Sequence, residues 1–491
     1  MSSVQSIRKT RLKKLENIRQ EGLNPYPAKT KRTHTCREVF DDFKNLSSQK
    51  SQVVLASRLR NIREHGGSTF AHIEDAAAKF QLYFKKDRLG EKKYKFFLDN
   101  FDIGDFIEAK GEVFLTKKGE RTLLVKDYRI LTKTLLPLPE KWHGLKDVEE
   151  RFRKRYLDLA MNRDVREKFL VRNQIIKSIR EFLEKQGFIE VETPILQLIP
   201  GGASARPFKT YLNALDFDLY LRVAPELFLK RLLVGGFEKV YEIGRCFRNE
   251  GVDFSHNPDF TMLEFYWAYA DYEDLMEMIE EMFEYLLKQI LANSEQQTTI
   301  NYQNHKINFE RPWPRIKFQD LIKKECRIDI EKTETKDLRQ KVKEFDLKIE
   351  SKDPRCKIID ELYKKTVRPK LIQPCFVINH PIEMTPLAKS VEGDLTKAAR
   401  FQLVAGGIEL NNAFSELNDP LEQDKRFKEQ EKHRKGGDDE AQRYDKDFIE
   451  ALEYGMPPAA GFGMGLDRLA ALLTDSHSLR EIILFPLMRP K

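Results

Sequence analysis

A pair of strand-like runs joined by a polar loop, between Val240 and Tyr272, constrains the fold of this chain more than any other stretch. The residues of one parity in the two runs are Glu242, Gly244, Cys246, Arg248 and Glu250, and then Met262, Glu264 and Tyr266. Side chains alternate between the two faces of a strand, so each set would share a face. The connecting loop is rich in residues that favour turns. The stretch predicts a β-hairpin with one chemically loaded face.

The loaded face of this hairpin suits an anion. Arg248 stands at the end of the first run, His256 lies in the loop, and Phe260 follows at its exit. A guanidinium is always charged and grips phosphate through two parallel hydrogen bonds, and an aromatic ring beside it can stack on a nucleobase. A hairpin stabilised by salt bridges is the other interpretation. These residues alone leave both interpretations open.

Two strings in the chain resemble a known enzyme class. FRNEG followed by HNPDFTMLEFY, residues 247–251 and 256–266, is similar to motif 2 of class II aminoacyl-tRNA synthetases, in the form of the lysyl family. GFGMGLDRLAALL, from Gly461 to Leu473, resembles motif 3. Two such strings in the right order are hard to obtain by chance. Because the second string matches neither GxxxxGK[ST] nor GxGxxG, P-loop and Rossmann folds are excluded.

The composition is that of a large globular enzyme. The 491 residues allow two to four domains, and 41% of them are hydrophobic. Basic residues number 86 and acidic ones 78, a mild excess of 8 that permits RNA binding on one face without requiring it. The five cysteines stand far apart, which predicts reduced thiols and neither disulfides nor zinc.

The sequence predicts a cytoplasmic protein that does not enter a membrane. No apolar run approaches the length of a membrane span. The N-terminal stretch MSSVQSIRKTRLKKL lacks the apolar core of a secretory signal. Within the N-terminal segment 1–50, residues Ser6 to Glu21 predict a basic helix. Contact with tRNA phosphates and a solvated cap on the next domain both fit it.

Five short runs with β character fill residues 51–134 and fit a small Greek-key barrel of the oligonucleotide-binding (OB) type. Their order resembles the anticodon-binding domain of the lysyl, aspartyl and asparaginyl synthetases. That resemblance implies that Phe70 stacks on an anticodon base, while Gln81 and Arg58 bond base edges. The alternative is that Phe70 is a core residue. Residues 135–148, which include Pro137, Pro139 and Trp142, predict a linker.

The rest of the chain, 149–491, is expected to be an α+β catalytic domain built on a mainly antiparallel sheet. A long helix from about Asp164 to Gln186, with the strand FIEVETPIL after it, resembles motif 1 and implies a homodimer. Residues 296–371 are then the insertion between motifs 2 and 3, in which we expect helices and no chemistry. Gly461, Gly463 and Gly465 alternate on one face of a strand, a flat floor for a nucleotide.

The implied reaction joins lysine to ATP, which gives lysyl-adenylate and pyrophosphate, and then transfers the lysyl group to tRNA-Lys. In-line attack on the α-phosphorus demands charge neutralisation and positioning rather than a protein nucleophile. By resemblance the catalytic residues are Arg248, on the α-phosphate, and Arg468, on the outer phosphates with His256. Phe260 would stack on adenine and Glu250 would bind its amino group.

Magnesium is the implied cofactor, held by Glu409 and Glu416 with the phosphates of ATP. The odd offset of these residues would put them on opposite faces of a regular strand. A bulge near Asn411 is therefore required if both face the site. The family usually has a small residue where Asn411 stands, and this departure affects side-chain packing there.

The resemblance also implies how lysine is bound. Glu416 and Tyr266 would take the ε-ammonium, and Arg248 and Asn412 the carboxylate. The α-amino group would go to Glu226, Glu264 and the backbone of Gly202, with Phe414 lining the pocket. Glu226 also suits the dipole of its own helix, which is the alternative for that residue.

Three other functions fit the sequence less well. Aspartyl- and asparaginyl-tRNA synthetases share both domains, but their substrates would not call for carboxylates at Glu226, Glu264 and Glu416. A non-catalytic RNA-binding or regulatory descendant is disfavoured because Arg248, Arg468 and both candidate magnesium carboxylates are retained. A lysyl-phospholipid synthase would need membrane spans, and the sequence has none of the required length.

Overall fold

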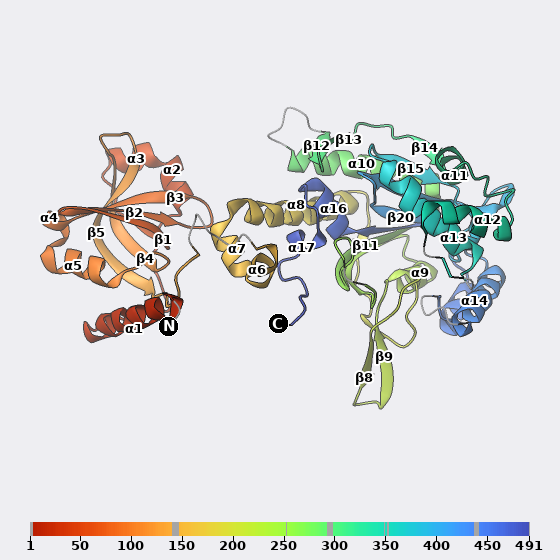
Figure 1. The fold of residues 1–491 in the computed structure, drawn as a ribbon, viewed down its shortest axis with the longest axis horizontal. Helices are drawn as coiled ribbons and strands as arrows, with labels where there is room; N and C mark the ends of the chain where they lie inside the picture. Colours follow the sequence, from red (N-terminus) through yellow and green to blue (C-terminus); the bar gives the residue numbers. More distant parts are fainter. Residues whose placement is uncertain are drawn as a thin grey trace. The chain divides into compact units, whose positions relative to one another are not determined.

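The computed structural model describes residues 3–139, 147–251, 253–291, 298–347, 349–350, 353–436 and 441–490. The chain divides into two compact units, Met1–Lys146 and Asp147–Lys491. Each unit is coloured along the sequence in Figure 1 and has its own layers of helix and sheet. Within the described ranges, no helix combines the length and apolar character needed to cross a bilayer. The predicted linker residue Trp142 lies outside the described residues.

The first unit is built on a closed five-stranded barrel, as predicted, with strand order β1-β2-β3-β5-β4. Its strands are β1 (Val53–His65), β2 (Ser68–Glu74), β3 (Lys79–Lys85), β4 (Phe106–Leu115) and β5 (Arg121–Thr132). Inward-facing apolar residues of all five strands fill its interior, among them Leu55, Ile73 and Leu123, which are fully buried. The five runs with β character therefore correspond to the five strands of the barrel.

Short helices surround the barrel of the first unit. They are α1 (Ser3–Gln20), α2 (Cys36–Asp41), α3 (Phe43–Ser48), α4 (Lys86–Leu89) and α5 (Glu91–Asn100). The basic helix α1 was predicted, and it buries Leu15 and Ile18. Its Arg11 donates hydrogen bonds to the carbonyl oxygens of Leu136 and Ile103, at 2.9 and 3.0 Å. One face of α1 is therefore committed to packing within its own unit.

The second unit is organised on a nine-stranded sheet. Its order is β14-β15-β18-β20-β21-β11-β10-β6, with β19 paired to β18. The strands are β6 (Ile189–Glu190), β10 (Lys239–Phe247), β11 (Asp259–Ala268), β14 (Arg315–Lys317), β15 (Cys375–Ile378), β18 (Arg400–Ala405), β19 (Ile408–Glu409), β20 (Asn411–Ser415) and β21 (Ala459–Gly465). Only the β6–β10 and β14–β15 pairs among these are parallel. The predicted hairpin is β10–β11, and the sheet is mainly antiparallel as expected.

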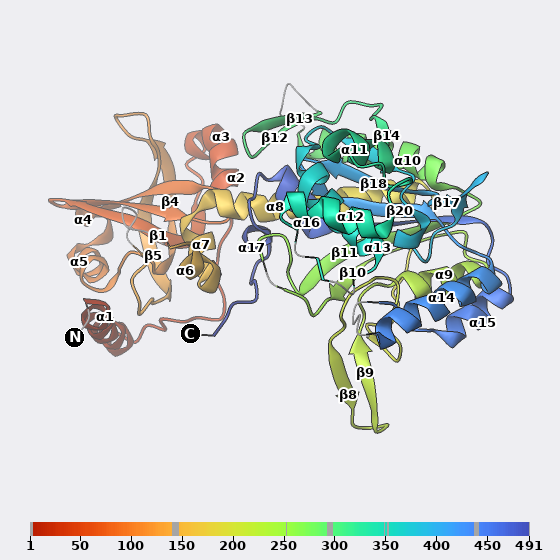
Figure 2. The same cartoon turned by 45° about the vertical axis from the view of Figure 1, so that its right-hand side comes forward.

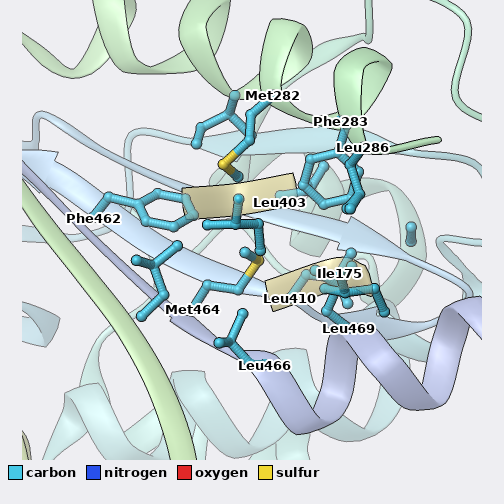
Figure 3. Close-up of a cluster of buried hydrophobic side chains, with 14 of the residues drawn as sticks. Ile175, Met282, Phe283, Leu286, Leu403, Leu410, Phe462, Met464, Leu466 and Leu469 are labelled. Atoms are coloured by element: carbon cyan, nitrogen blue, oxygen red, sulfur yellow. The ribbon is translucent and has the colours of Figure 1, made fainter. Parts of the chain in front are cut away.

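Long helices cover one face of this sheet. They include α8 (Arg163–Lys185), α10 (Tyr272–Ile290) and α16 (Leu466–Leu473). Figure 3 shows side chains of α10 and α16 meeting those of the sheet, including Met282, Phe283, Leu403, Phe462 and Leu469. On β11 the buried residues of this core are Leu263 and Phe265, whose parity is opposite to that of Glu264. The polar parity therefore faces away from the helices.

Shorter helices lie elsewhere in the second unit, visible in Figures 1 and 2. They are α6 (Val148–Arg153), α7 (Arg155–Met161), α9 (Glu226–Val234), α14 (Pro420–Lys435), α15 (Lys446–Glu453) and α17 (Leu479–Ile482). The helix predicted to start at Pro225 begins one residue later, at Glu226. Tyr266, Phe414 and residues of α9 and α15 form a second apolar cluster beside the polar face of the sheet.

The strand predicted at FIEVETPIL is wrong as a continuous element. Only Ile189–Glu190 and, beyond Pro194, Leu196–Gln197 (β7) are extended and paired. Proline has no N–H to give to a ladder, which accounts for the break. β7 instead joins β8 (Lys209–Leu212) and β9 (Phe217–Leu221), a hairpin that extends away from the main sheet in Figure 2.

The segment predicted as an insertion of helices contains strands as well. It opens with the hairpin β12 (Thr299–Tyr302) and β13 (His305–Asn308), and its β14 pairs with the edge strand β15 of the main sheet. The helices α11 (Phe318–Cys326), α12 (Thr335–Lys341) and α13 (Arg355–Leu362) follow and share one apolar core. A short π-helix (Tyr363–Val367) and a 3₁₀ turn (Arg368–Lys370) close the segment.

Candidate active site

The predicted site residues of β11 and β20 share the sheet face opposite the helices α8, α10 and α16. Pairing sets Tyr266 opposite Gly461 and Glu264 opposite Gly463. On the other side of β21, Asn412 is opposite Gly463 and Phe414 is opposite Gly461. Directly opposed residues of neighbouring strands point to the same face. The alternation observed in the sequence therefore assembles one continuous surface from β11, β21 and β20.

Three carboxylates are buried at one end of this surface. Glu226, Glu264 and Glu416 are 6%, 3% and 1% exposed. The Tyr266 hydroxyl donates a hydrogen bond to Glu264 Oε2 at 3.1 Å. Gly202, at φ +90°, lies so near Glu226 that an added Cβ would be 2.8 Å from the Glu226 Cβ. Five residues predicted to bind lysine thus lie in contact or in register, and the pocket is strongly acidic.

A residue that the sequence analysis missed balances this charge. Lys230, one turn after Glu226 on α9, donates a 2.6 Å hydrogen bond to Glu226 Oε1 and forms a salt bridge with Glu416. Its side chain is fully buried. A lysine within an amphipathic helix is usually an exposed residue, so the sequence carried no signal for this one.

Burial controls protonation in this pocket. Burial raises the pKa of Glu416 to about 8, although the nearby Lys230 ammonium works to lower it. Burial and the charge of Glu226 raise the pKa of Glu264 well above its usual range. Groups shifted in this way are typical of sites that desolvate a charged ligand.

One carboxylate oxygen of Glu416 faces the space beside Gly461, where the chain has no side chain. Glu416 Oε1 is buried without a hydrogen-bond partner among the described residues. A Cβ added to Gly461 would lie 1.9 Å from that oxygen and 2.5 Å from a ring carbon of Tyr266. A buried carboxylate oxygen costs free energy unless something bonds it. The absence of a side chain at residue 461 therefore leaves Glu416 Oε1 and Tyr266 facing the same space.

A second group of predicted residues gathers at the other end of the surface. Arg468 lies with one guanidinium nitrogen 3.4 Å from His256 Nε2 and another 3.4 Å from the Glu409 carbonyl oxygen. His256 also contacts Asp253 at 3.0 Å. Arg368, from the predicted insertion, lies 3.3 Å from Glu409 Oε2. Arg368 is a further residue that the sequence analysis missed, because no chemistry was expected in the insertion.

Arg248 and Phe260 lie together, as the hairpin predicted. The Arg248 guanidinium carbon is 5.1 Å from the centre of the Phe260 ring, and Arg248 donates its backbone N–H to Pro258 at 2.9 Å. Arg248 Nε is buried without a partner among the described residues. Glu250 lies beyond the end of β10 and is exposed. The strand thus delivers Arg248 to the site face and leaves Glu250 in the loop.

The two predicted magnesium ligands lie at the two ends of the segment that contains the irregularity near Asn411. Glu409 ends β19, and Glu416 follows the end of β20. Each has its own cation, Arg368 or Lys230. Residues that could hold a metal as a group of three or more His, Cys, Asp or Glu side chains are not found in the described part of the chain. The assignment of both carboxylates to magnesium stays a prediction; Glu409 is partly exposed and Glu416 is buried.

The bulge required near Asn411 is present. Val404 pairs with Glu409 and Phe401 pairs with Ala413, so three steps along β18 oppose four along the partner. Asn411 Oδ1 accepts the backbone N–H of Leu403 at 2.6 Å, which replaces a ladder bond lost at the irregularity. Asn411 thus has a structural role in place of the small residue usual in the family.

Further buried contacts fix the site, and the sequence analysis did not identify them. Arg400 donates to Asn412 Oδ1 at 2.6 Å, which leaves the Asn412 amide nitrogen for a ligand. Asp467 accepts from Arg172 at 2.8 Å and from the backbone N–H of Thr261 at 3.0 Å. This second contact ties the first turn of α16 to β11 beside Arg468. Such long-range partners have no local sequence signature.

The barrel has a separate surface that holds the predicted anticodon residues. Phe70 pairs with Tyr83 and His72 pairs with Gln81, so Phe70 and Gln81 are diagonal neighbours on the outer face. The Phe70 ring stacks on Tyr83 at 4.6 Å and is partly exposed, which argues against a core role. Gln81 accepts a 2.7 Å bond from Thr122. Arg58, on β1, stacks over Phe106 at 4.4 Å.

Comparisons with known families agree with these two surfaces. A family model described as tRNA synthetases class II (D, K and N) matches residues 147–489, and one described as OB-fold nucleic acid binding domain matches residues 53–131. The first match alone spans well over half of the chain. The protein is therefore a class II aminoacyl-tRNA synthetase of the group that serves aspartate, lysine and asparagine.

Full-length relatives narrow the group to one family. A protein named lysine–tRNA ligase from Carboxydothermus hydrogenoformans is 50% identical, over 98% of this chain and 98% of its own. Proteins of the same name from Thermosipho africanus and Roseiflexus sp. are each 47% identical, over 99% of this chain and 97% and 99% of theirs. The chain belongs to the lysine–tRNA ligase family.

Proposed function

We infer that this protein activates L-lysine with ATP to lysyl-adenylate and transfers the lysyl group to the 3′ end of tRNA-Lys. Two observations together support this conclusion. The chain is 47–50% identical to lysine–tRNA ligases over nearly its full length, and its site buries three carboxylates. The fold adds a barrel of the nucleic-acid-binding type. Activation of lysine needs the pocket, and recognition of the tRNA for transfer needs the barrel.

The acidic pocket is the basis for choosing lysine. An ε-ammonium is a strongly hydrated point charge, so a pocket that removes its water must supply a carboxylate and further acceptors. The buried, unpartnered Glu416 Oε1 supports Glu416 as the partner of the ε-ammonium. An aspartate side chain would instead meet like charge, and an asparagine amide would leave the carboxylate uncompensated.

Other residues take the remaining groups of lysine. We assign the α-amino group to Glu226, Glu264 and the backbone of Gly202, and the carboxylate to Arg248 and Asn412. Phe414 lines the aliphatic part of the pocket, where it is 7% exposed. Tyr266 is assigned to both ends, because its ring lies beside Glu416 and Gly461 while its hydroxyl bonds Glu264.

ATP lies along the same sheet face, toward Arg468. Phe260 stacks on the adenine, and Glu250 binds its amino group. Arg248, between Phe260 and the lysine pocket, neutralises the α-phosphate as the lysine carboxylate attacks in line. Arg468 and His256, 3.4 Å apart, hold the outer phosphates and the departing pyrophosphate. The chain's own contribution is thus orientation and charge.

Magnesium fits this arrangement, with Glu409 and Glu416 as its proposed carboxylate ligands. A hard divalent cation is commonly held by one or two carboxylates together with the phosphate oxygens of its nucleotide. Glu409 is partly exposed and lies next to Arg468 and Arg368, at the phosphate end of the face. When bound there, the ion neutralises phosphate charge. Arg368 must release Glu409 for this, since the two are paired at 3.3 Å.

The barrel is assigned to the anticodon of tRNA-Lys. Partly exposed Phe70 offers a stacking platform, with Gln81 diagonal to it and Arg58 further along the same face.

We also propose a homodimer, because the motif 1 region exposes Leu170, Ile189, Leu196 and Leu198 by 48–63%. Lysine, ATP and tRNA are together in the cytoplasm, where we propose that the enzyme works.

Aminoacylation tests the assignment. The full-length protein, with ATP, magnesium and unfractionated tRNA, should attach radiolabelled lysine to tRNA through a base-labile ester. Parallel reactions with labelled aspartate and asparagine serve as controls and should give background label. Background label with lysine, or transfer of aspartate or asparagine at a comparable rate, would refute the proposed function.

A further inference from the structure

Lys230 is a charged side chain in the pocket that the scheme above does not use. Its ammonium is fully buried and contacts two carboxylates, Glu226 at 2.6 Å and Glu416. Its Nζ also lies 5.5 Å from the ring centre of Phe414 and 5.9 Å from that of Phe448. One ammonium therefore bridges the carboxylates assigned to opposite ends of the substrate.

Lys230 keeps its positive charge in this bridge. Burial works to lower the pKa of the Lys230 ammonium, but the charges of Glu226 and Glu416 raise it above its ordinary value. A buried cation between two carboxylates and two aromatic rings is held in one place, because every alternative position would leave a charge without a partner.

The geometry leaves each carboxylate with one free oxygen aimed at the pocket. Glu226 uses Oε1 for Lys230, and its Oε2 would be 3.5 Å from a Cβ on Gly202. Glu416 uses Oε2 for Lys230, and its Oε1 would be 1.9 Å from a Cβ on Gly461. Both free oxygens thus face positions where the chain has glycine. Lys230 holds the two oxygens that face away from the glycines, and so it orients the two that face them.

We propose that Lys230 is a specificity-determining positioning residue, which fixes the separation of the free Glu226 and Glu416 oxygens to the length of lysine. The inference rests on the proposed function, because it assigns those oxygens to the α-amino and ε-ammonium groups. An amino acid one methylene shorter, ornithine, satisfies one end and leaves the other carboxylate short of its partner. An unpaired buried charge is costly, so spacing becomes discrimination.

The test compares lysine and ornithine in pyrophosphate exchange with full-length variants. Lys230→Met keeps an unbranched chain but removes the charge. We expect its KM for lysine to rise at least about tenfold, its KM for ATP to stay within about twofold, and its preference for lysine over ornithine in kcat/KM to fall about tenfold. Arg231→Met is the matched control, because Arg231 is the next residue on α9 and pairs with Asp445 at 2.9 Å instead. It should leave the lysine-to-ornithine ratio unchanged.

A second variant decides the matter if thermal melting shows that Lys230→Met does not fold. Lys230→Arg keeps the charge but places a wider, forked cation between Glu226 and Glu416. It should change the lysine-to-ornithine ratio by more than about threefold with the KM for ATP preserved. A folded Lys230 variant whose ratio equals that of the wild type, or whose two KM values rise together, would overturn the proposal. The proposed function fails separately, if the wild type shows no lysine-dependent exchange.

Discussion

The polar faces of the barrel and of the catalytic sheet both arise from strand alternation, but they differ in how far their functional side chains are exposed to solvent. On the barrel, Phe70 and Tyr83 stack on each other and remain partly exposed. On the catalytic sheet, Glu264 and Glu416 are almost fully buried, and Lys230 provides the countercharge. A surface that stacks on unpaired bases needs open rings, whereas a pocket that strips water from an ammonium needs buried charge.

The largest effect is expected in the pocket. Glu416→Gln keeps the shape but removes the charge opposite the ε-ammonium, a change worth about 2–5 kcal/mol for a buried charged pair. Lysine-dependent pyrophosphate exchange should fall by well over about tenfold, mainly through the KM for lysine. Glu422→Gln, on α14 and paired with Arg426 at 2.9 Å, is the control. Equal behaviour of the two variants would contradict the assignment of Glu416.

The barrel should show a smaller effect of a different kind. Phe70→Ala removes one stacking platform, worth about 1–3 kcal/mol, so the KM for tRNA in aminoacylation should rise about fivefold to a hundredfold. Exchange measured without tRNA should stay near wild type, because no base is read in that assay. Parallel losses in both assays would indicate a folding defect and make Phe70 a core residue.

The hydroxyl of Tyr266 should matter less. Tyr266→Phe removes the 3.1 Å hydrogen bond to Glu264 and leaves a buried carboxyl with one partner fewer, which costs about 1–2 kcal/mol. The KM for lysine should rise by about tenfold, while that for ATP stays unchanged. A change in the KM for ATP, with the KM for lysine unchanged, would contradict the assignment of Tyr266 to the lysine pocket.

The smallest predicted effect is that of pH. Burial raises the pKa of Glu416 to about 8, with Glu226, Glu264, Lys230 and Tyr266 around it. Below that pH the carboxyl is mostly neutral, and the ammonium of lysine binds the ionised form. The KM for lysine should therefore fall about fivefold as pH rises from about 7 to about 8.5, where the ε-amine is still protonated. In Glu416→Gln this slope should vanish; a slope that persists there would assign it to another group.

The sequence predicted the elements and the polar face because these depend on local periodicity. The barrel strands were predicted from short runs with β character, and the parity of Glu264 and Tyr266 placed these two on one face of the hairpin. Only strand pairing in the structure shows that Gly461 shares that face. The bulge near Asn411 was deduced from an odd offset between two carboxylates. Parity specifies which side a residue faces and says nothing of its distance from another. The shared metal site at Glu409 and Glu416 stays a prediction for that reason.

Residues that act through distant partners escaped the sequence analysis. Lys230 looked like an ordinary lysine of an amphipathic helix, because only the fold brings Glu416 to it from 186 positions later. Arg368 lies in a segment without a recognisable motif, and it reaches Glu409 only after β14 and β15 join the sheet. Charge pairing of this kind depends on tertiary structure, which one sequence without relatives does not reveal.

Pyrophosphate exchange with each of the twenty amino acids, in the absence of tRNA, tests the central claim most directly. That claim is that a buried acidic pocket, completed by Lys230, selects an amino acid with a cationic side chain of one length. Lysine alone should support rapid exchange. Rapid exchange with aspartate or asparagine, and none with lysine, would contradict the account.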